Sequence, residues 1–216
     1  MSTRESYGSF KVFSRHTNMK NSDKHLKHDK CLTPLINTLV LDELPSKTSM
    51  LFELIRYTLI REVSKNASKG QPPFEVHFED LTPQRILRMS SEDFKMKGVS
   101  RSAASHVRSI AIHYDAHTDF WSNLERHDSE LILRRLSQIK GVHPVDVQKM
   151  LLFGLKRPDI FPDKDPELKA AVIRLYQLDP KQADLEQQIA AISDGWRPYR
   201  SRACRYLWLW WGKQKK

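Results

Sequence analysis

An aspartate directly before a proline, Asp165-Pro166, is the residue of this 216-residue chain best placed to do chemistry. Leu168, Val172 and Leu175 follow it at helical spacing, so the aspartate stands where a helix is expected to begin. A carboxylate there is a good helix cap, which is worth about 1 kcal/mol. It is also a fixed negative charge that can face a reaction centre. The residue pattern leaves both interpretations open.

The second candidate site is the turn between two expected helices in the segment of about 130–155. Ile132, Leu136 and Ile139 have the spacing of one helix face, and Pro144 suits the first position of the next helix. The intervening "KGVHP" is too short for anything but a tight helical hairpin. A helix start offers unpaired backbone N–H groups and the positive end of a dipole, which together attract phosphate. A plain packing hairpin is the alternative.

Three possible metal ligands, His25, His28 and Cys31, are spaced to share one helix face. Structural zinc takes four ligands, and no fourth one follows nearby, so we expect no metal site and no cofactor. The two cysteines, Cys31 and Cys204, are too few for a disulfide framework or an iron–sulfur cluster, which favours a reducing compartment. The chain also lacks a glycine-rich P-loop and a GxSxG motif.

The net charge is +10, from 36 lysines and arginines against 26 aspartates and glutamates. Such an excess favours a polyanionic partner, nucleic acid first and an acidic membrane second. No apolar run approaches the roughly 18 residues of a membrane span. Residues 1–22 are basic and serine-rich without the apolar core of a secretory signal, so we expect a flexible tail. A weak organelle-targeting signal is the alternative.

Helical spacing dominates the rest of the chain. Thr82-Pro83 and "SSEDF" are typical helix starts, and further apolar faces recur at steps of three and four. The stretch 66–83 is expected to be a long loop. Its "FEVHF" is the one convincing alternating pattern, which is too little for a sheet. The predicted fold class is all-α.

The C-terminal "WRPYRSRACRYLW", residues 196–208, is the most specific motif. Together with "IKGVHPVDVQKMLLFGLKRPDIFPDKD", residues 139–165, it resembles the helix-hairpin-helix DNA glycosylases of the 3-methyladenine DNA glycosylase II family. "HLKHDKCLTPLI" and "LFELIRYTLIREVS" resemble the first two helices of that family, and "SSEDFKMKGVSRSAASHVRSIA" resembles its middle. The likeness covers roughly residues 24–211.

The resemblance implies one glycosylase-like domain over residues 23–216, with two packed helical subdomains and a cleft between them for the damaged base. It implies that the hairpin holds a DNA backbone phosphate through main-chain N–H groups, and that the damaged nucleotide is flipped out of the stack. The residues expected at this DNA contact are Lys140, Gly141, Val142, His143, Val145 and Lys149.

The resemblance also assigns roles at the reaction centre. Asp165 matches the catalytic aspartate of the family, in the pattern of Phe161, three residues and then aspartate. Trp208 is expected to form an aromatic wall of the base pocket. The residues expected in the loop that fills the gap left by the flipped base are Arg61, Glu62 and Val63.

Several positions depart from the family pattern. The second glycine of the hairpin is His143, which in a left-handed turn would cost about 1–2 kcal/mol. Val145-Asp146 replaces a tryptophan-threonine pair, so an aromatic face is lost and a negative charge enters the expected phosphate site. A glutamine pair in the insertion loop is replaced by Arg61-Glu62.

Two functions follow from these observations. The first is a monofunctional glycosylase that hydrolyses the N-glycosidic bond of alkylated purines in base excision repair. The alternative is a non-catalytic DNA-binding relative that recognises damaged or abasic sites. In both cases we expect a monomer that binds double-stranded DNA, does not bind a membrane, and is intracellular and DNA-associated. Its compartment would be the nucleus in a eukaryote and the cytoplasm or nucleoid in a bacterium.

Overall fold

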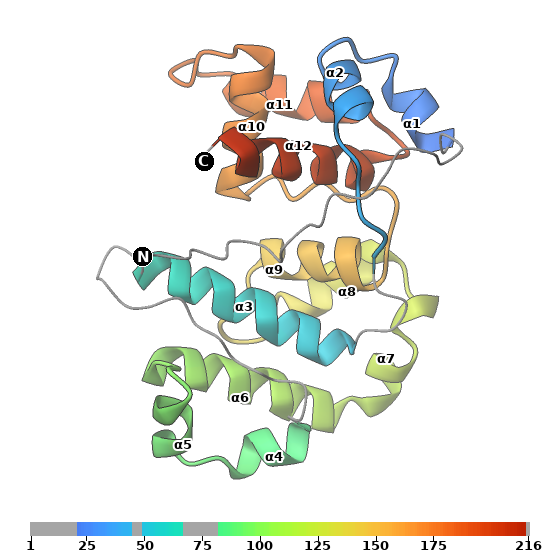
Figure 1. Ribbon diagram of the computed structural model, residues 1–216. Helices are drawn as coiled ribbons and strands as arrows, with labels where there is room; N and C mark the ends of the chain where they lie inside the picture. The colour runs from blue at the N-terminus through green and yellow to red at the C-terminus, as the bar shows by residue number, and fades with distance from the viewer. Residues whose placement is uncertain (1–20, 45–48, 67–81, 215–216) are drawn as a thin grey trace. The chain divides into compact units, whose positions relative to one another are not determined.

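A computed structural model describes residues 21–44, 49–66 and 82–214 of the chain (Figure 1). These residues form helices and connecting turns, and no β-strand lies among them. The predicted all-α fold class is therefore confirmed. The "FEVHF" stretch and residues 1–20 of the expected tail lie outside the described residues, and the first helix begins at Asn21.

The chain divides into two compact units. The first, called here the terminal unit, holds the described residues of both ends of the chain, 21–44 and 156–214. Its helices are α1 (Asn21–Leu26), α2 (Leu32–Thr38), α10 (Pro166–Tyr176), α11 (Leu185–Asp194) and α12 (Arg200–Gln214). In this unit α12 packs against both α10 and α2.

The second unit, called here the central unit, holds the described residues between 49 and 155. Its elements are α3 (Met50–Asn66), α4 (Pro83–Arg88), α5 (Ser91–Met96), α6 (Arg101–Ala116), α7 (Thr118–Ser122), η2 (Leu124–Arg126), α8 (Ser129–Leu136), α9 (Pro144–Lys149) and η3 (Met150–Gly154). Figure 1 shows α3 between α6 and α9, and α3 packs against both of them. The predicted pair of helical subdomains agrees with this division, whereas the boundary of an N-terminal tail at residue 22 stays a prediction.

Local capping explains where the helices of the central unit begin. The Ser90 hydroxyl accepts a hydrogen bond from the Asp93 backbone N–H at 3.1 Å, and the Asp93 carboxylate accepts one from the Ser90 N–H at 2.7 Å. The Thr82 and Ser100 hydroxyls each accept one backbone N–H at the starts of α4 and α6, and the Asp128 carboxylate does so at the start of α8. Each cap satisfies a backbone donor that the first helical turn leaves unpaired.

The core of the central unit lies along α6. Val107, Ile110 and Ala111 are fully buried there, and Ile86 of α4 and Ile55 of α3 are buried as well. Burial of these side chains removes apolar area from water, which is the main favourable contribution to folding. Among the described residues no helix is long and apolar enough to cross a lipid bilayer.

Candidate functional site

Asp165 is the N-cap of α10 and is 2% exposed. Its Oδ1 accepts a hydrogen bond from the backbone N–H of Leu168 at 2.7 Å and another from Nε1 of Trp208 at 3.0 Å. Both donors belong to the terminal unit, so the two contacts orient the carboxylate within this unit. The capping interpretation is confirmed, and Trp208 lies against the same carboxylate that the sequence marks for chemistry.

The C-terminal motif positions the loop that carries Asp165. The guanidinium of Arg200 donates to both carboxylate oxygens of Asp159, at 2.7 and 3.1 Å, and to its backbone carbonyl at 2.8 Å. The Ser201 hydroxyl donates to the carbonyl of Arg157 at 2.6 Å and accepts from the N–H of Ile160 at 2.9 Å. The first turn of α12 therefore holds the chain just before Asp165 through side-chain hydrogen bonds.

A buried thiol, Cys204, reports the electrostatics around Asp165. Burial raises the pKa of the Cys204 thiol well above its usual range, and the negative charge of Asp165 raises that pKa further. A thiol that stays protonated is a poor nucleophile and a poor metal ligand. In this part of the terminal unit Asp165 is therefore the better candidate for chemistry.

The hairpin of the central unit turns on Gly141, whose φ is +87°. A β-carbon at this glycine would lie 2.1 Å from Cγ and Cδ2 of His106 on α6, so the imidazole ring occupies the space of a side chain. His143 has φ of −105° and is extended. The prediction of backbone strain at His143 is therefore wrong, because the residue of this turn with a left-handed backbone is Gly141.

Two backbone donors of the hairpin are left for a ligand. The N–H of Val142 donates to the carbonyl of Ile139 at 3.0 Å, and the N–H of His143 donates to Oδ2 of Asp146 at 3.0 Å. Among the described residues, the N–H groups of Gly141 and Val145 have no hydrogen-bond acceptor. Backbone N–H groups in such turns are suited to phosphate oxygens.

Arg61 ties the hairpin to α3. Its Nε lies 3.0 and 3.1 Å from the two carboxylate oxygens of Asp146, and its Nη2 donates to the carbonyl of Gly141 at 2.6 Å. Its Nη1 also pairs with Glu62 at 2.8 Å. The Arg61 side chain is only 15% exposed. We call this group of contacts the Arg61 latch.

The latch corrects the prediction of an insertion loop. Arg61, Glu62 and Val63 all lie inside α3, which continues to Asn66, and Arg61 is engaged with the hairpin. The prediction that the negative charge of Asp146 would oppose a bound phosphate is also wrong. Asp146 is 1% exposed and paired with Arg61, so its carboxylate closes the first turn of α9 and does not face a ligand.

The remaining hairpin residues divide by exposure. Lys140 is exposed, and Val145 is half-buried. Val142 and Lys149 are buried, at 5% and 9% exposure. Lys149 was predicted to contact DNA; at 9% exposure it offers little side-chain surface for such a contact, and its role in binding stays a prediction. Val142 anchors the turn in the core and cannot present its side chain to DNA.

The three possible metal ligands near the N-terminus do not form a site. The rings of His25 and His28 meet edge-on, with centroids 6.3 Å apart, and His25 also packs edge-on against Tyr199 at 5.4 Å. Among the described residues no group of three or more histidine, cysteine, aspartate or glutamate side chains is arranged to hold a metal ion.

Comparison with known proteins assigns the fold. No protein-family model matches the chain. The chain is 34% identical over 126 residues to YfjP of Bacillus subtilis (strain 168), provisionally named a DNA-3-methyladenine glycosylase. It is 30% identical over 128 residues to DNA-3-methyladenine glycosylase 1 of Schizosaccharomyces pombe (strain 972 / ATCC 24843). These alignments cover 58% and 59% of this chain but 43% and 55% of the relatives, so the chain matches about half of their length.

A solved structure extends this likeness to most of the chain. The 3-methyladenine DNA glycosylase Mag1 of S. pombe, in complex with abasic DNA, superposes with a TM-score of 0.73 at 24% identity. The superposition covers 88% of this chain and 95% of Mag1. The chain has the fold of the 3-methyladenine DNA glycosylases. The resemblance predicted from the sequence is confirmed.

Within this glycosylase fold, sequence reasoning missed three residues that position the candidate site: His106, Arg200 and Ser201. The last two lie inside the motif "WRPYRSRACRYLW", which marked the region without showing what each residue contacts. His106 gives no such signal, because its partner Gly141 is 35 positions away in the sequence and meets it only in the folded unit.

Gly141→Ala is expected to destabilise the central unit by about 2 kcal/mol or more. The left-handed backbone alone costs about 1–2 kcal/mol for a residue with a β-carbon, and the new methyl group also collides with His106. Urea denaturation measures the effect. Duplex affinity should fall equally for all sequences, because a phosphate contact reads no bases.

The double variant His106→Ala/Gly141→Ala separates the two causes. Removing the ring relieves the collision but leaves the backbone strain. Gly141→Ala should therefore lower the free energy of unfolding less in the His106→Ala background than in the wild type. If Gly141→Ala and the wild type unfold at the same urea concentration, His106 does not pack against this turn as described.

Proposed function

We propose that the protein is a monofunctional DNA glycosylase that hydrolyses the N-glycosidic bond of alkylated purines in duplex DNA. One observation carries the proposal: Asp165 caps α10 and accepts the indole N–H of Trp208, within a chain of glycosylase fold. The activity in the names of the relatives supports the same reaction.

The reaction suits a single buried carboxylate. When the bond between an alkylated purine and the sugar breaks, the cationic base leaves as a neutral molecule and positive charge develops on the sugar. The Asp165 carboxylate would stabilise that charge and help to position the attacking water. Because Asp165 is 2% exposed, its charge acts in a medium of lower effective dielectric than bulk water. The base needs no strong general acid, because it is already charged.

A lyase step is not part of this proposal. By the family resemblance, bifunctional relatives place a lysine near the start of the second hairpin helix, where it forms a Schiff base with the sugar. Here the corresponding stretch is "HPVDV", residues 143–147, which contains no lysine. Lys149, the first lysine after it, is buried.

For DNA, we propose that the hairpin grips one backbone phosphate through the N–H groups of Gly141 and Val145, and that Lys140 adds a charge beside it. The damaged base would be flipped toward Asp165 and Trp208. The protein would act as an intracellular monomer on double-stranded DNA that contains damaged bases.

The alternative, a non-catalytic binder of damaged or abasic sites, has one observation in its favour. Val145 stands where an aromatic pocket residue is expected and gives no cation–π face to a methylated base. Incubation with duplexes carrying methylated, deaminated or abasic sites distinguishes the two functions. Release of an alkylated purine supports the enzyme, whereas tight retention of abasic duplex without release from any substrate supports the binder.

Duplex affinity is expected to fall steeply with salt, because each neutralised phosphate releases counterions. Lys140→Gln should weaken binding equally for all sequences and reduce the slope of log K against log salt by about 1. Lys95→Gln, a change of equal charge on exposed α5, is the matched control and should leave the slope unchanged. An affinity that does not change with salt would contradict the phosphate grip.

A further inference from the structure

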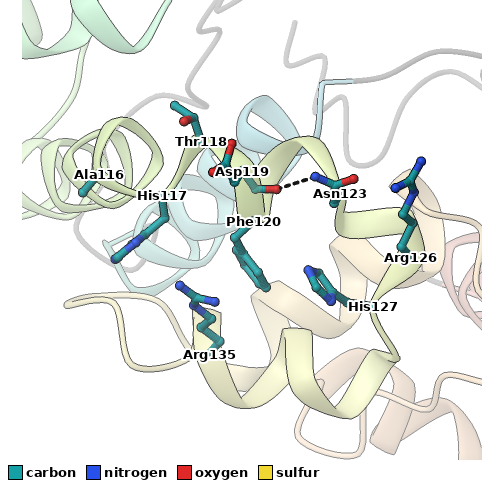
Figure 2. A pocket seen from close by; sticks show the side chains of 9 residues that line it. All are labelled: Ala116, His117, Thr118, Asp119, Phe120, Asn123, Arg126, His127 and Arg135. Carbon is teal, nitrogen blue, oxygen red and sulfur yellow. Dashed lines mark hydrogen bonds between the residues drawn. The ribbon is translucent and has the colours of Figure 1, made fainter.

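A surface pocket of about 610 Å³ in the central unit has no role in the proposed reaction (Figure 2). It is lined by the end of α6, by α7 and η2, and by one side chain of α8. Four of its lining residues are basic: His117, Arg126, His127 and Arg135. Asp119 is its one carboxylate. Two arginines against one aspartate give the lining a net charge of +1 when both histidines are neutral.

Arg135 is held in place by an aromatic ring and not by an acid. Its guanidinium lies 4.2 Å from the centroid of the Phe120 ring, and His127 stacks with Phe120 at 5.1 Å between centroids. Figure 2 shows Phe120 between Arg135 and His127. A guanidinium stacked on a ring keeps its N–H donors at its edge, where they can bind an oxyanion.

The two arginines have no acidic partner in the part of the chain that the structure describes. Neither Arg126 nor Arg135 forms an ion pair or a side-chain hydrogen bond there, and the Asp119 carboxylate pairs with neither of them. Figure 2 shows a hydrogen bond from the side-chain amide of Asn123 to the backbone carbonyl of Asp119, at 2.9 Å. It involves neither arginine. The positive charge of the pocket is therefore not neutralised from within.

His113 is half-buried next to the pocket, with its ring centroid 4.5 Å from that of His117. Burial lowers the pKa of His113 to about 4, and the charges of His117 and Arg135 contribute to the shift. His113 is accordingly neutral and accepts a hydrogen bond at Nδ1 from Nε1 of Trp121, at 3.1 Å. Charges that oppose a proton on His113 favour an anion in the neighbouring space.

We propose that this pocket binds a phosphate group through Arg135 and Arg126, with His117 and His127 beside it. Arginine is suited to phosphate because its planar fork offers two parallel N–H donors. The volume lies within the range of about 300–1,000 Å³ typical of small-molecule sites, so it admits a phosphate ester as large as a mononucleotide. The phosphate can come from such an ester or from a DNA strand. The site is separate from the hairpin and does not depend on glycosylase activity.

Titration with inorganic phosphate at constant ionic strength tests the proposal, with the ring resonances of His117 and His127 followed by NMR. Wild type should show saturable shifts, and Arg135→Gln should bind phosphate at least about tenfold more weakly. Arg126→Gln is the second variant, because its exposed side chain makes no contact that folding needs. Arg134→Gln is the matched control, with the same charge change on an exposed residue of α8 outside the lining.

A second arm measures duplex affinity of the same variants. If Arg135→Gln and Arg126→Gln weaken duplex binding more than Arg134→Gln does, the phosphate belongs to DNA. If all three variants bind duplex alike while phosphate binding is lost in the first two, the ligand is a small phosphate ester. The proposal is overturned if wild type shows no saturable shift, or if Arg126→Gln and Arg135→Gln bind phosphate as the control does. Base release assayed in parallel tests the proposed glycosylase separately.

Discussion

Asp165→Asn should reduce release of alkylated purines by at least about a hundredfold, the scale of a lost electrostatic contact in a closed active site. The substitution keeps an oxygen that can accept from the Leu168 N–H and from Trp208, so the cap of α10 should survive. The negative charge is what the variant loses. Single-turnover release of base from a methylated duplex measures the effect.

Asp163→Asn is the control for this variant. Asp163 is exposed in the same loop, and its carboxylate lies 3.5 Å from the ammonium group of Lys164. It does not match the aspartate of the family, so its loss should leave turnover nearly unchanged. Duplex binding should survive in both variants. Equal turnover by Asp165→Asn and wild type would show that Asp165 is only a helix cap.

Arg61→Ala should lower the free energy of unfolding of the central unit by about 3 kcal/mol. The variant leaves the buried Asp146 carboxylate without its partner, and removing one member of a buried ion pair is strongly destabilising. The carbonyl of Gly141 also loses its donor. Because the hairpin turn is then less well held, duplex affinity should fall for all sequences alike. Urea denaturation and duplex titration on one preparation measure both effects.

Two comparisons separate the latch from a general effect of charge. Arg134→Ala removes an exposed arginine of α8 in the same unit, and a surface substitution of this kind changes the free energy of unfolding by at most about 0.5 kcal/mol. In a double-mutant cycle, Arg61→Ala should cost much less when Asp146 is already Asn. Additive effects of the two substitutions would mean that the latch does not couple α3 to the hairpin.

Features that depend on neighbours in the sequence were predictable. Pro144 begins α9, Asp165 caps α10, and Ser90 and Thr82 cap their helices, as the local patterns indicate. Capping depends on residues within one turn, so the sequence itself contains both partners. The specific C-terminal motif likewise pointed to Trp208, which contacts Asp165.

Features that depend on tertiary packing were not predictable. Arg61 and Asp146 are 85 positions apart, and each was assigned a separate and incorrect role before the structure joined them. The burial of Lys149 follows from how α9 packs against α3, which spacing along α9 does not reveal. The backbone angle of His143 also escaped prediction, because a family glycine need not be the left-handed residue of the turn.

The measurement that tests the central claim most directly is base release by the wild-type protein from a duplex containing an alkylated purine, with the free base quantified by chromatography. We expect release of the alkylated base, an intact DNA strand until the abasic site is cleaved chemically, and at least about a hundredfold less release by Asp165→Asn. No release from any alkylated duplex, together with tighter binding to abasic than to intact DNA, would contradict the glycosylase and identify a non-catalytic binder.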